Sequence, residues 1–188
     1  MQQKQQTQKL YFIAIVPSEP VYSFAQQQKE YFAKAYNSKA ALRSPPHITL
    51  HMPFQYKEHK EEKIVQALEL LSKEHRSFSL DIDGFGAFEP RVIYLTVEKT
   101  NEIARLQHAV GETMKTQLNL FNANYKDQVF RPHLTVAFRD LRKQKFTEAW
   151  QEFKDKSYRQ SIDIHTFSLL KHNGKAWEIH REFGLALK

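Results

Sequence analysis

The chain has 188 residues and a mass of 22.2 kDa, and its 41% hydrophobic and 26% charged residues are typical of a globular protein. It contains no cysteine, which excludes disulfides, thiolate metal ligands and a cysteine nucleophile. The net charge of +7 and the pI near 9.5 favour anionic partners such as nucleic acid, although a solvated lysine-rich surface has the same composition.

The first quarter of the chain alternates strand and helix patterns. Residues 1–9 are mostly glutamine and lysine, without the apolar core of a signal peptide, and we expect a flexible lead there. A β-branched and aromatic run predicts a buried strand over residues 10–16. This run is too short to span a bilayer, so we expect a soluble, cytoplasmic protein without a membrane partner. A helix follows, with a stripe at Val21, Phe24, Gln28, Tyr31 and Ala35.

The rest of the chain contains the same kinds of element in a repeated order. Pro45-Pro46 excludes helix and precedes an alternating strand, followed by a helix around residues 64–71 and strands over 78–82 and 92–97. The second half has a helix over 103–118, a strand after Pro132, a helix over 146–153, and strands over 161–170 and 176–187. We infer an internal duplication within one α+β domain spanning residues 1–188.

Two short motifs recur at matching places in the two halves. They are Pro46-His47-Ile48-Thr49-Leu50 and Pro132-His133-Leu134-Thr135-Val136. With this composition, chance would give only about 0.02 copies of Pro-His-x-Thr. Duplication explains how two copies arose, but it does not explain why His and Thr persist while most of the surrounding sequence has diverged.

The alternation of a strand predicts how these motifs are arranged. His47, Thr49 and His51 project from one face, whereas Ile48 and Leu50 project from the other. The same pattern places His133 and Thr135 on one face of their strand. The aliphatic residues can therefore fill a core while the imidazoles and hydroxyls face a cleft.

The chemistry of these residue types points to a phosphodiester. Two imidazoles, with an ordinary pKa near ~6.5, suit a base and an acid acting in one step at neutral pH. Two threonine hydroxyls can donate hydrogen bonds to an anionic oxygen. A metal site is the alternative, but the spacing of His47 and His51 suits a metal only in a helix, which Pro46 disfavours. We therefore expect no metal and no cofactor.

The remaining histidines are expected to be structural. A lone histidine in a strand or helix more often lies in a core or on the surface than in a catalytic site. This interpretation applies to His51, His75, His108, His165, His172 and His180.

The two motifs resemble those of the 2H (two-histidine) phosphoesterase superfamily, close to its 2′-5′ RNA ligase and cyclic phosphodiesterase branch. The resemblance covers the predicted elements from Leu10 to Leu185. It implies a bilobal fold of two pseudo-symmetric lobes, each an antiparallel sheet flanked by helices, with the active site in the groove between them. It also implies that His47 and His133 are catalytic, and that Thr49 and Thr135 bind phosphate.

Four further residues are candidates for substrate binding. Relatives often carry a basic residue at the fifth position after the second histidine, where this chain has Phe138, followed by Arg139. Arg139 and Arg131 are therefore both candidate phosphate contacts. Phe54 and Tyr56, beyond the first motif, could stack a base, although aromatic residues at a strand end more often belong to a core.

The resemblance implies metal-independent opening of 2′,3′-cyclic phosphates on RNA ends or nucleotides. It also implies reversible 2′-5′ ligation, in which a 5′-hydroxyl end takes the place of water. Either histidine can be the base, because the two halves are pseudo-equivalent. The alternative is a non-catalytic RNA- or nucleotide-binding module of the same fold. Two proton-transfer groups argue against it, since binding alone needs neither. We expect the protein to be a monomer.

Overall fold

The computed structural model describes residues 7–121 and 129–187. In these ranges the helices are α1 (Val21–Tyr36), α2 (Glu61–Glu74), α3 (Asn101–Leu118) and α4 (Lys143–Phe153). The strands are β1 (Gln8–Ile15), β2 (Ile48–Lys57), β3 (Phe78–Phe88), β4 (Val92–Val97), β5 (His133–Ala137), β6 (Arg159–Ile164), β7 (Thr166–His172) and β8 (Trp177–Gly184). Short 3-10 helices, η1 (Ala40–Arg43) and η2 (Glu58–Lys60), precede β2 and α2. The α+β class is confirmed.

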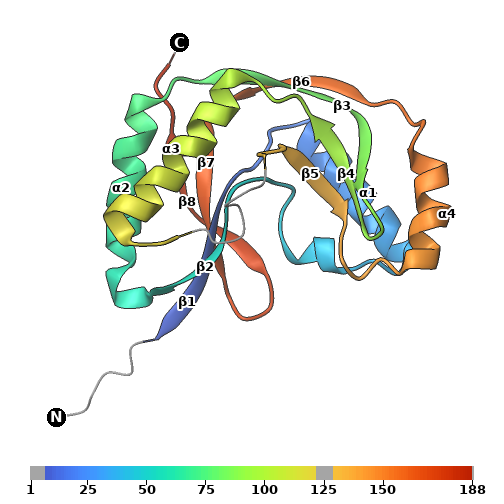
Figure 1. Cartoon of the computed structure of the whole chain (residues 1–188), viewed down its shortest axis with the longest axis horizontal. Coiled ribbons are helices and arrows are strands. Elements are labelled where there is room, and N and C mark those ends of the chain that lie inside the picture. The colour runs from blue at the N-terminus through green and yellow to red at the C-terminus, as the bar shows by residue number, and fades with distance from the viewer. Residues whose placement is uncertain (1–6, 122–128, 188) are drawn as a thin grey trace.

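The strands form one curled sheet in the order β6-β3-β4-β5-β2-β1-β7-β8, with antiparallel neighbours (Figure 1). β2 and β5 are paired only at Ile48 and Leu134. This short junction divides the sheet into two four-stranded halves. The predicted lobes are therefore two halves of a continuous sheet that meet at the two histidine motifs.

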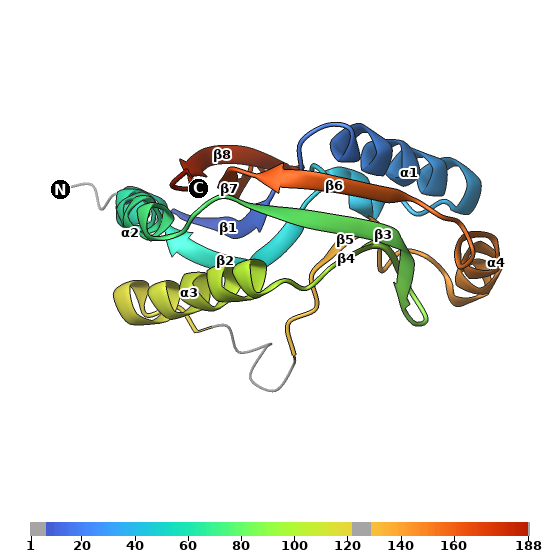
Figure 2. The same ribbon diagram turned by 90° about the horizontal axis from the view of Figure 1, so that it is seen from above.

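Each half of the sheet is covered by its own pair of helices (Figures 1 and 2). α2 and α3 pack together at one end, against β8 and β2 respectively. At the other end α1 packs on β5, and Phe32 of α1 meets Phe153 of α4 with ring centroids 4.6 Å apart. α1, which leads from β1 to β2, thus covers the opposite half, and α3 crosses in the reverse direction. This exchange ties the two halves into one core.

Several of the predicted boundaries were wrong. β3 continues past residue 82 to Phe88, and β8 ends at Gly184. β1 begins at Gln8, and Gln8 and Lys9 pair with β2, so these two residues belong to the strand and not to a lead. The predicted strand over residues 161–170 is broken at the exposed His165. Before the break, residues alternate between buried and exposed along β6. After it, residues 167–170 of β7 are all buried, so side chains on both faces of this strand are shielded from solvent.

The buried stripe of α1 also differs from the prediction. Its buried residues are Val21, Ala25, Lys29 and Phe32, so the face that enters the core is rotated from the predicted one. Lys29 is only 1% exposed, although lysine is rarely buried. Because the charged Lys29 interrupts the buried stripe, the spacing of apolar residues does not predict this face correctly.

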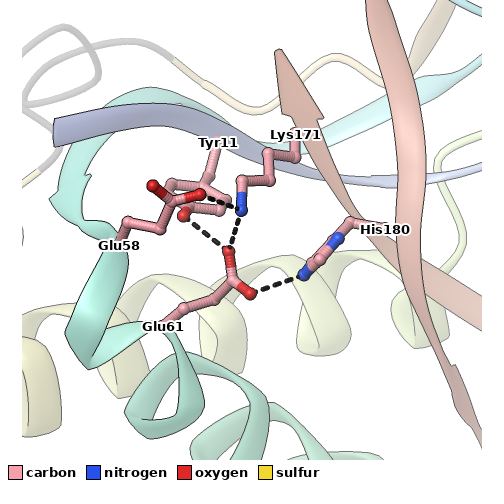
Figure 3. Close-up of polar contacts among 5 residues, drawn as sticks. All are labelled: Tyr11, Glu58, Glu61, Lys171 and His180. Carbon is pink, nitrogen blue, oxygen red and sulfur yellow. Dashed lines mark hydrogen bonds and ion pairs between the residues drawn. The ribbon is translucent and has the colours of Figure 1, made fainter. Parts of the chain in front are cut away.

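A cluster of polar side chains fastens the start of α2 to the sheet, and we call it the Glu61 cluster (Figure 3). The Glu61 carboxylate accepts hydrogen bonds from Tyr11 Oη (2.6 Å), Lys171 Nζ (2.7 Å) and His180 Nε2 (2.7 Å). Lys171 also donates to Glu58 at 3.0 Å. The five residues come from β1, η2, α2, β7 and β8, so the cluster joins elements that are distant in sequence.

None of the helices that the structure describes has the length and the apolar composition needed to cross a membrane.

Candidate active site

The two histidine motifs lie side by side where the halves of the sheet join. Ile48 of β2 pairs with Leu134 of β5, and both side chains are fully buried. Because the strands are antiparallel, His47 and Thr135 flank this pair on one side, and Thr49 and His133 flank it on the other. The predicted site residues, which are far apart in the sequence, are thus brought together by one strand pairing.

All four residues line a single cavity of about 1070 Å³, which we call the histidine cavity. His47, Thr49, His133 and Thr135 are each half-buried, whereas the aliphatic residues between and after them are buried. This pattern is the one that the strand alternation predicts. The polar faces of both motifs therefore converge on the same space.

Both imidazoles are held in the same way. Nδ1 of His47 lies 2.8 Å from the carbonyl oxygen of Pro45, and Nδ1 of His133 lies 2.8 Å from that of Arg131. A carbonyl oxygen can only accept, so each Nδ1 carries the hydrogen. Each neutral ring therefore keeps its lone pair on Nε2, which is the atom that remains to exchange a proton.

Burial disfavours the charged form of both histidines. It lowers the pKa of His47 to about 4, although the bond to the Pro45 carbonyl opposes this, and a positive charge on Lys29 or on His133 lowers the pKa further. Burial likewise lowers the pKa of His133 below its ordinary value. Both rings are consequently neutral in the ligand-free protein at pH 7. An anionic ligand between them would favour protonation of either ring.

An aromatic ring from a neighbouring strand supports each histidine. The Phe12 ring of β1 lies 4.8 Å from that of His47, and the Tyr94 ring of β4 lies 5.1 Å from that of His133. Gly86 makes room for Tyr94, because a Cβ there would fall 2.5 Å from a carbon of the Tyr94 ring. These contacts restrict the rotation of both imidazoles.

The cavity is strongly basic. Arg131 and Arg139, the two predicted phosphate contacts, both line it and are exposed. The sequence did not single out Arg43 and Lys29, which line it as well. No aspartate or glutamate occurs among the described lining residues. The arrangement therefore suits an anion that carries one or more negative charges.

One wall of the cavity is aromatic and comes from the strands at the far edge of the sheet. Trp177 and His172 lie there with ring centroids 5.0 Å apart, and Trp177 meets Phe12 edge-on at 4.7 Å. The sequence predicts only a structural role for His172. Its place in this wall could not be found from a local motif, because it depends on the pairing of β1 with β7.

Three residues near the first motif lie apart from the cavity. The register of β2 against β1 shifts after Thr49, so that His51 turns into the core, is 3% exposed and no longer shares the face of His47. Phe54 packs against the core, where it stacks on Tyr11 with ring centroids 5.9 Å apart. Tyr56 packs against the same core. Neither aromatic residue is among the described lining residues, so the structure does not bring these two base-stacking candidates to the site.

Over residues 7–121 and 129–187, no three His, Asp or Glu side chains are grouped in a way that could hold a metal ion.

Comparison with known proteins identifies the family. The family model described as the 2′-5′ RNA ligase superfamily matches residues 17–176, a range that includes both motifs. The chain belongs to this superfamily. A Bacillus cytotoxicus relative with a provisional phosphoesterase name is 33% identical over 183 residues, covering 92% of this chain and 95% of the relative. A similarly named Geobacillus protein is 29% identical over 177 residues and covers 92% and 94%.

Solved structures share the fold at low sequence identity. Escherichia coli LigT complexed with 3′-AMP aligns with a TM-score of 0.69 and 16% identity, over 95% of this chain and 99% of LigT. The Thermus thermophilus protein TT0787 aligns with a TM-score of 0.65 and 18% identity, over 96% and 99%. The solved structures confirm the fold, and the family model and the Bacillus relative, taken together with them, confirm the predicted membership of the 2H superfamily and place the chain in a phosphoesterase family.

Proposed function

We propose that the protein opens 2′,3′-cyclic phosphates on RNA ends or nucleotides by two-histidine acid–base catalysis that needs no metal. The observation that carries this proposal is the pair of equivalently held imidazoles on one basic cavity. Each uses Nδ1 for a backbone carbonyl and keeps Nε2 for proton transfer. No other pair of titratable groups in the described cavity has this symmetry.

The reaction proceeds by in-line attack of water on phosphorus. One histidine takes a proton from the attacking water as the new P–O bond forms. The other gives a proton to the ribose oxygen as the ring P–O bond breaks, and the product is a phosphate monoester. One proton is taken up and one is released, so the pair needs no external acid, base or cofactor.

The remaining lining residues bind the substrate. Thr49 and Thr135 hydroxyls donate to the non-bridging oxygens, where negative charge shifts as phosphorus is attacked. Arg131 and Arg139, at opposite ends of β5, neutralise the phosphate and the adjoining RNA backbone. With a volume of about 1070 Å³, the cavity has room for a nucleotide.

The superfamily match favours a second reaction, 2′-5′ ligation. It is the same ring opening with a different nucleophile: an RNA 5′-hydroxyl attacks phosphorus in place of water, and the ribose 3′-oxygen leaves with the proton from the second histidine. The basic and aromatic walls suit both reactions, and they also suit a module that binds RNA without turnover. The assay below separates these three outcomes.

The test is incubation of the purified protein with 2′,3′-cyclic AMP and with an oligonucleotide that ends in a 2′,3′-cyclic phosphate. We expect the cyclic phosphate signal in ³¹P NMR to be replaced by that of a monoester. The His47→Ala/His133→Ala double variant, prepared identically, controls for contaminating nucleases. Adding a 5′-hydroxyl oligonucleotide tests for ligation. Unchanged substrate despite measurable RNA binding would overturn the proposal in favour of a binding module.

A further inference from the structure

A single lysine breaks the symmetry of the two histidine motifs. Both motifs share the preceding proline, the Nδ1 bond to a carbonyl and the threonine. However, α1, which precedes the first motif in the chain and packs on β5, carries Lys29, whose side chain is buried and lines the histidine cavity. The buried stripe of α3, the helix that precedes the second motif, contains no charged residue; it consists of Ile103, Leu106, Val110, Thr113 and Met114.

The contacts of Lys29 connect it to His47. Its ammonium donates to the carbonyl oxygen of Ser44 at 2.9 Å. The next carbonyl in the chain, that of Pro45, accepts from Nδ1 of His47. Lys29 therefore holds the segment that orients His47, and no carboxylate is found among the described residues that line the cavity with it. The charged or titratable groups facing His47 are Lys29 from α1, Arg43 from η1, Arg131, His133 and Arg139 around β5, and His172 from β7.

We propose that Lys29 is a positioning residue that sets the roles of the two histidines, making His47 the general base and His133 the general acid in cyclic phosphate opening. This inference rests on the proposed function. A cation fixed beside His47 opposes a second positive charge on its ring, whereas the cations that flank the strand of His133, Arg131 and Arg139, are exposed to solvent. Burial lowers the pKa of Lys29 itself to about 7, so an anionic substrate would also recruit a proton onto it.

The variant Lys29→Met tests the proposal, because it keeps length and burial but removes the charge. Lys34→Met is the matched control, since Lys34 lies exposed on the same helix. The readout is the pKa of each histidine ring, followed by NMR in the ligand-free protein and therefore independent of activity. We expect Lys29→Met to raise the pKa of His47 by about one unit and that of His133 by much less. The control should move neither.

A merely structural role gives a different result. Loosening of the cavity would hydrate both rings, so their pKa values would rise together, and that outcome would overturn the proposal. If Lys29→Met does not fold, the two histidine rings of the wild-type protein can be titrated by ¹⁵N NMR. A pKa of His47 well below that of His133 supports the proposal. A pKa of His47 equal to or above that of His133 contradicts it.

The pH dependence of catalysis distinguishes failure of this inference from failure of the proposed function. If cyclic phosphate is opened, Lys29→Met should shift the acid limb of the kcat/KM profile toward higher pH, following His47. If no cyclic phosphate is opened, the proposed function fails. In that case the NMR titration still shows whether Lys29 lowers the pKa of His47 more than that of His133.

Discussion

The histidine cavity and the Glu61 cluster place the same kinds of side chain under opposite conditions. In the cluster, Lys171 meets two carboxylates, and these bonds raise its pKa although partial burial opposes this. In the cavity, Lys29 meets only a neutral carbonyl, and burial lowers its pKa. Charges with partners hold elements together, whereas charges left without counter-ions are available to a ligand. The first region should therefore govern stability and the second activity.

The largest effect is expected from the histidines of the cavity. His47→Ala and His133→Ala should each lower kcat/KM by about 10²- to 10⁴-fold, because each removes one proton-transfer group. The double variant should be little worse than either alone, since the pair acts as a unit. The measurement is hydrolysis of a 2′,3′-cyclic nucleotide, with thermal unfolding as the control for folding. Near wild-type turnover in either single variant would refute the assignment.

The threonines should come next. Thr49→Val and Thr135→Val preserve shape but delete the hydroxyl, so each should lower kcat by roughly tenfold to a thousandfold. Both side chains are half-buried on the cavity, so thermal unfolding should change little. Unaltered kcat combined with a large loss of stability would mark the hydroxyls as structural.

These two predictions use residues that could be found from sequence, because a strand motif depends on local alternation alone. The residues that were misplaced depend on distant pairing. His51 leaves the face of His47 because β2 shifts its register against β1. The burial of Lys29 was not predicted, because a lysine on an amphipathic helix is expected at the exposed edge of the apolar stripe. No local pattern shows that α1 crosses to cover β5.

In the Glu61 cluster, the expected effect is on stability and not on catalysis. Glu61→Gln removes the carboxylate that three donors share, and it should lower the free energy of unfolding by about 1–3 kcal/mol. Glu62→Gln is the matched control, because Glu62 is exposed in the same helical turn. Activity at saturating substrate should be unchanged in both. A loss of activity without a loss of stability would contradict the view that the Glu61 cluster governs stability and the histidine cavity governs activity.

This stabilisation should depend on pH in a defined window. Burial raises the pKa of Glu61, but the bonds from Lys171, Tyr11 and His180 outweigh it and lower the pKa to about 2, from an ordinary 4.5. A lowered folded pKa gives stability that is present above pH 4.5 and is lost as the pH falls toward 2. Denaturant unfolding of Glu61→Gln and wild type should therefore converge over that range. A constant difference down to pH 2 would contradict the role of the charge.

The smallest effect belongs to His51, which lies in the core beside the site. Burial lowers its pKa, and its Nε2 has no partner among the described residues. The unfolded chain therefore binds more protons below about pH 6.5, and stability falls as the pH falls through that value. His51→Asn should reduce this slope by at most ~1.4 kcal/mol per pH unit. The control is His59→Asn, at an exposed position, and an equal slope in both variants would refute the prediction.

The most direct test of the central claim is the pH dependence of kcat/KM for a 2′,3′-cyclic nucleotide, measured in an excess of chelator. Two coupled imidazoles, one neutral and one protonated, predict a bell-shaped profile. Its two apparent pKa values belong to the pair and not to single residues. Because burial lowers the pKa of both rings, the maximum should lie below about pH 6.5. Activity that disappears in chelator and returns with a divalent ion would contradict the two-histidine mechanism.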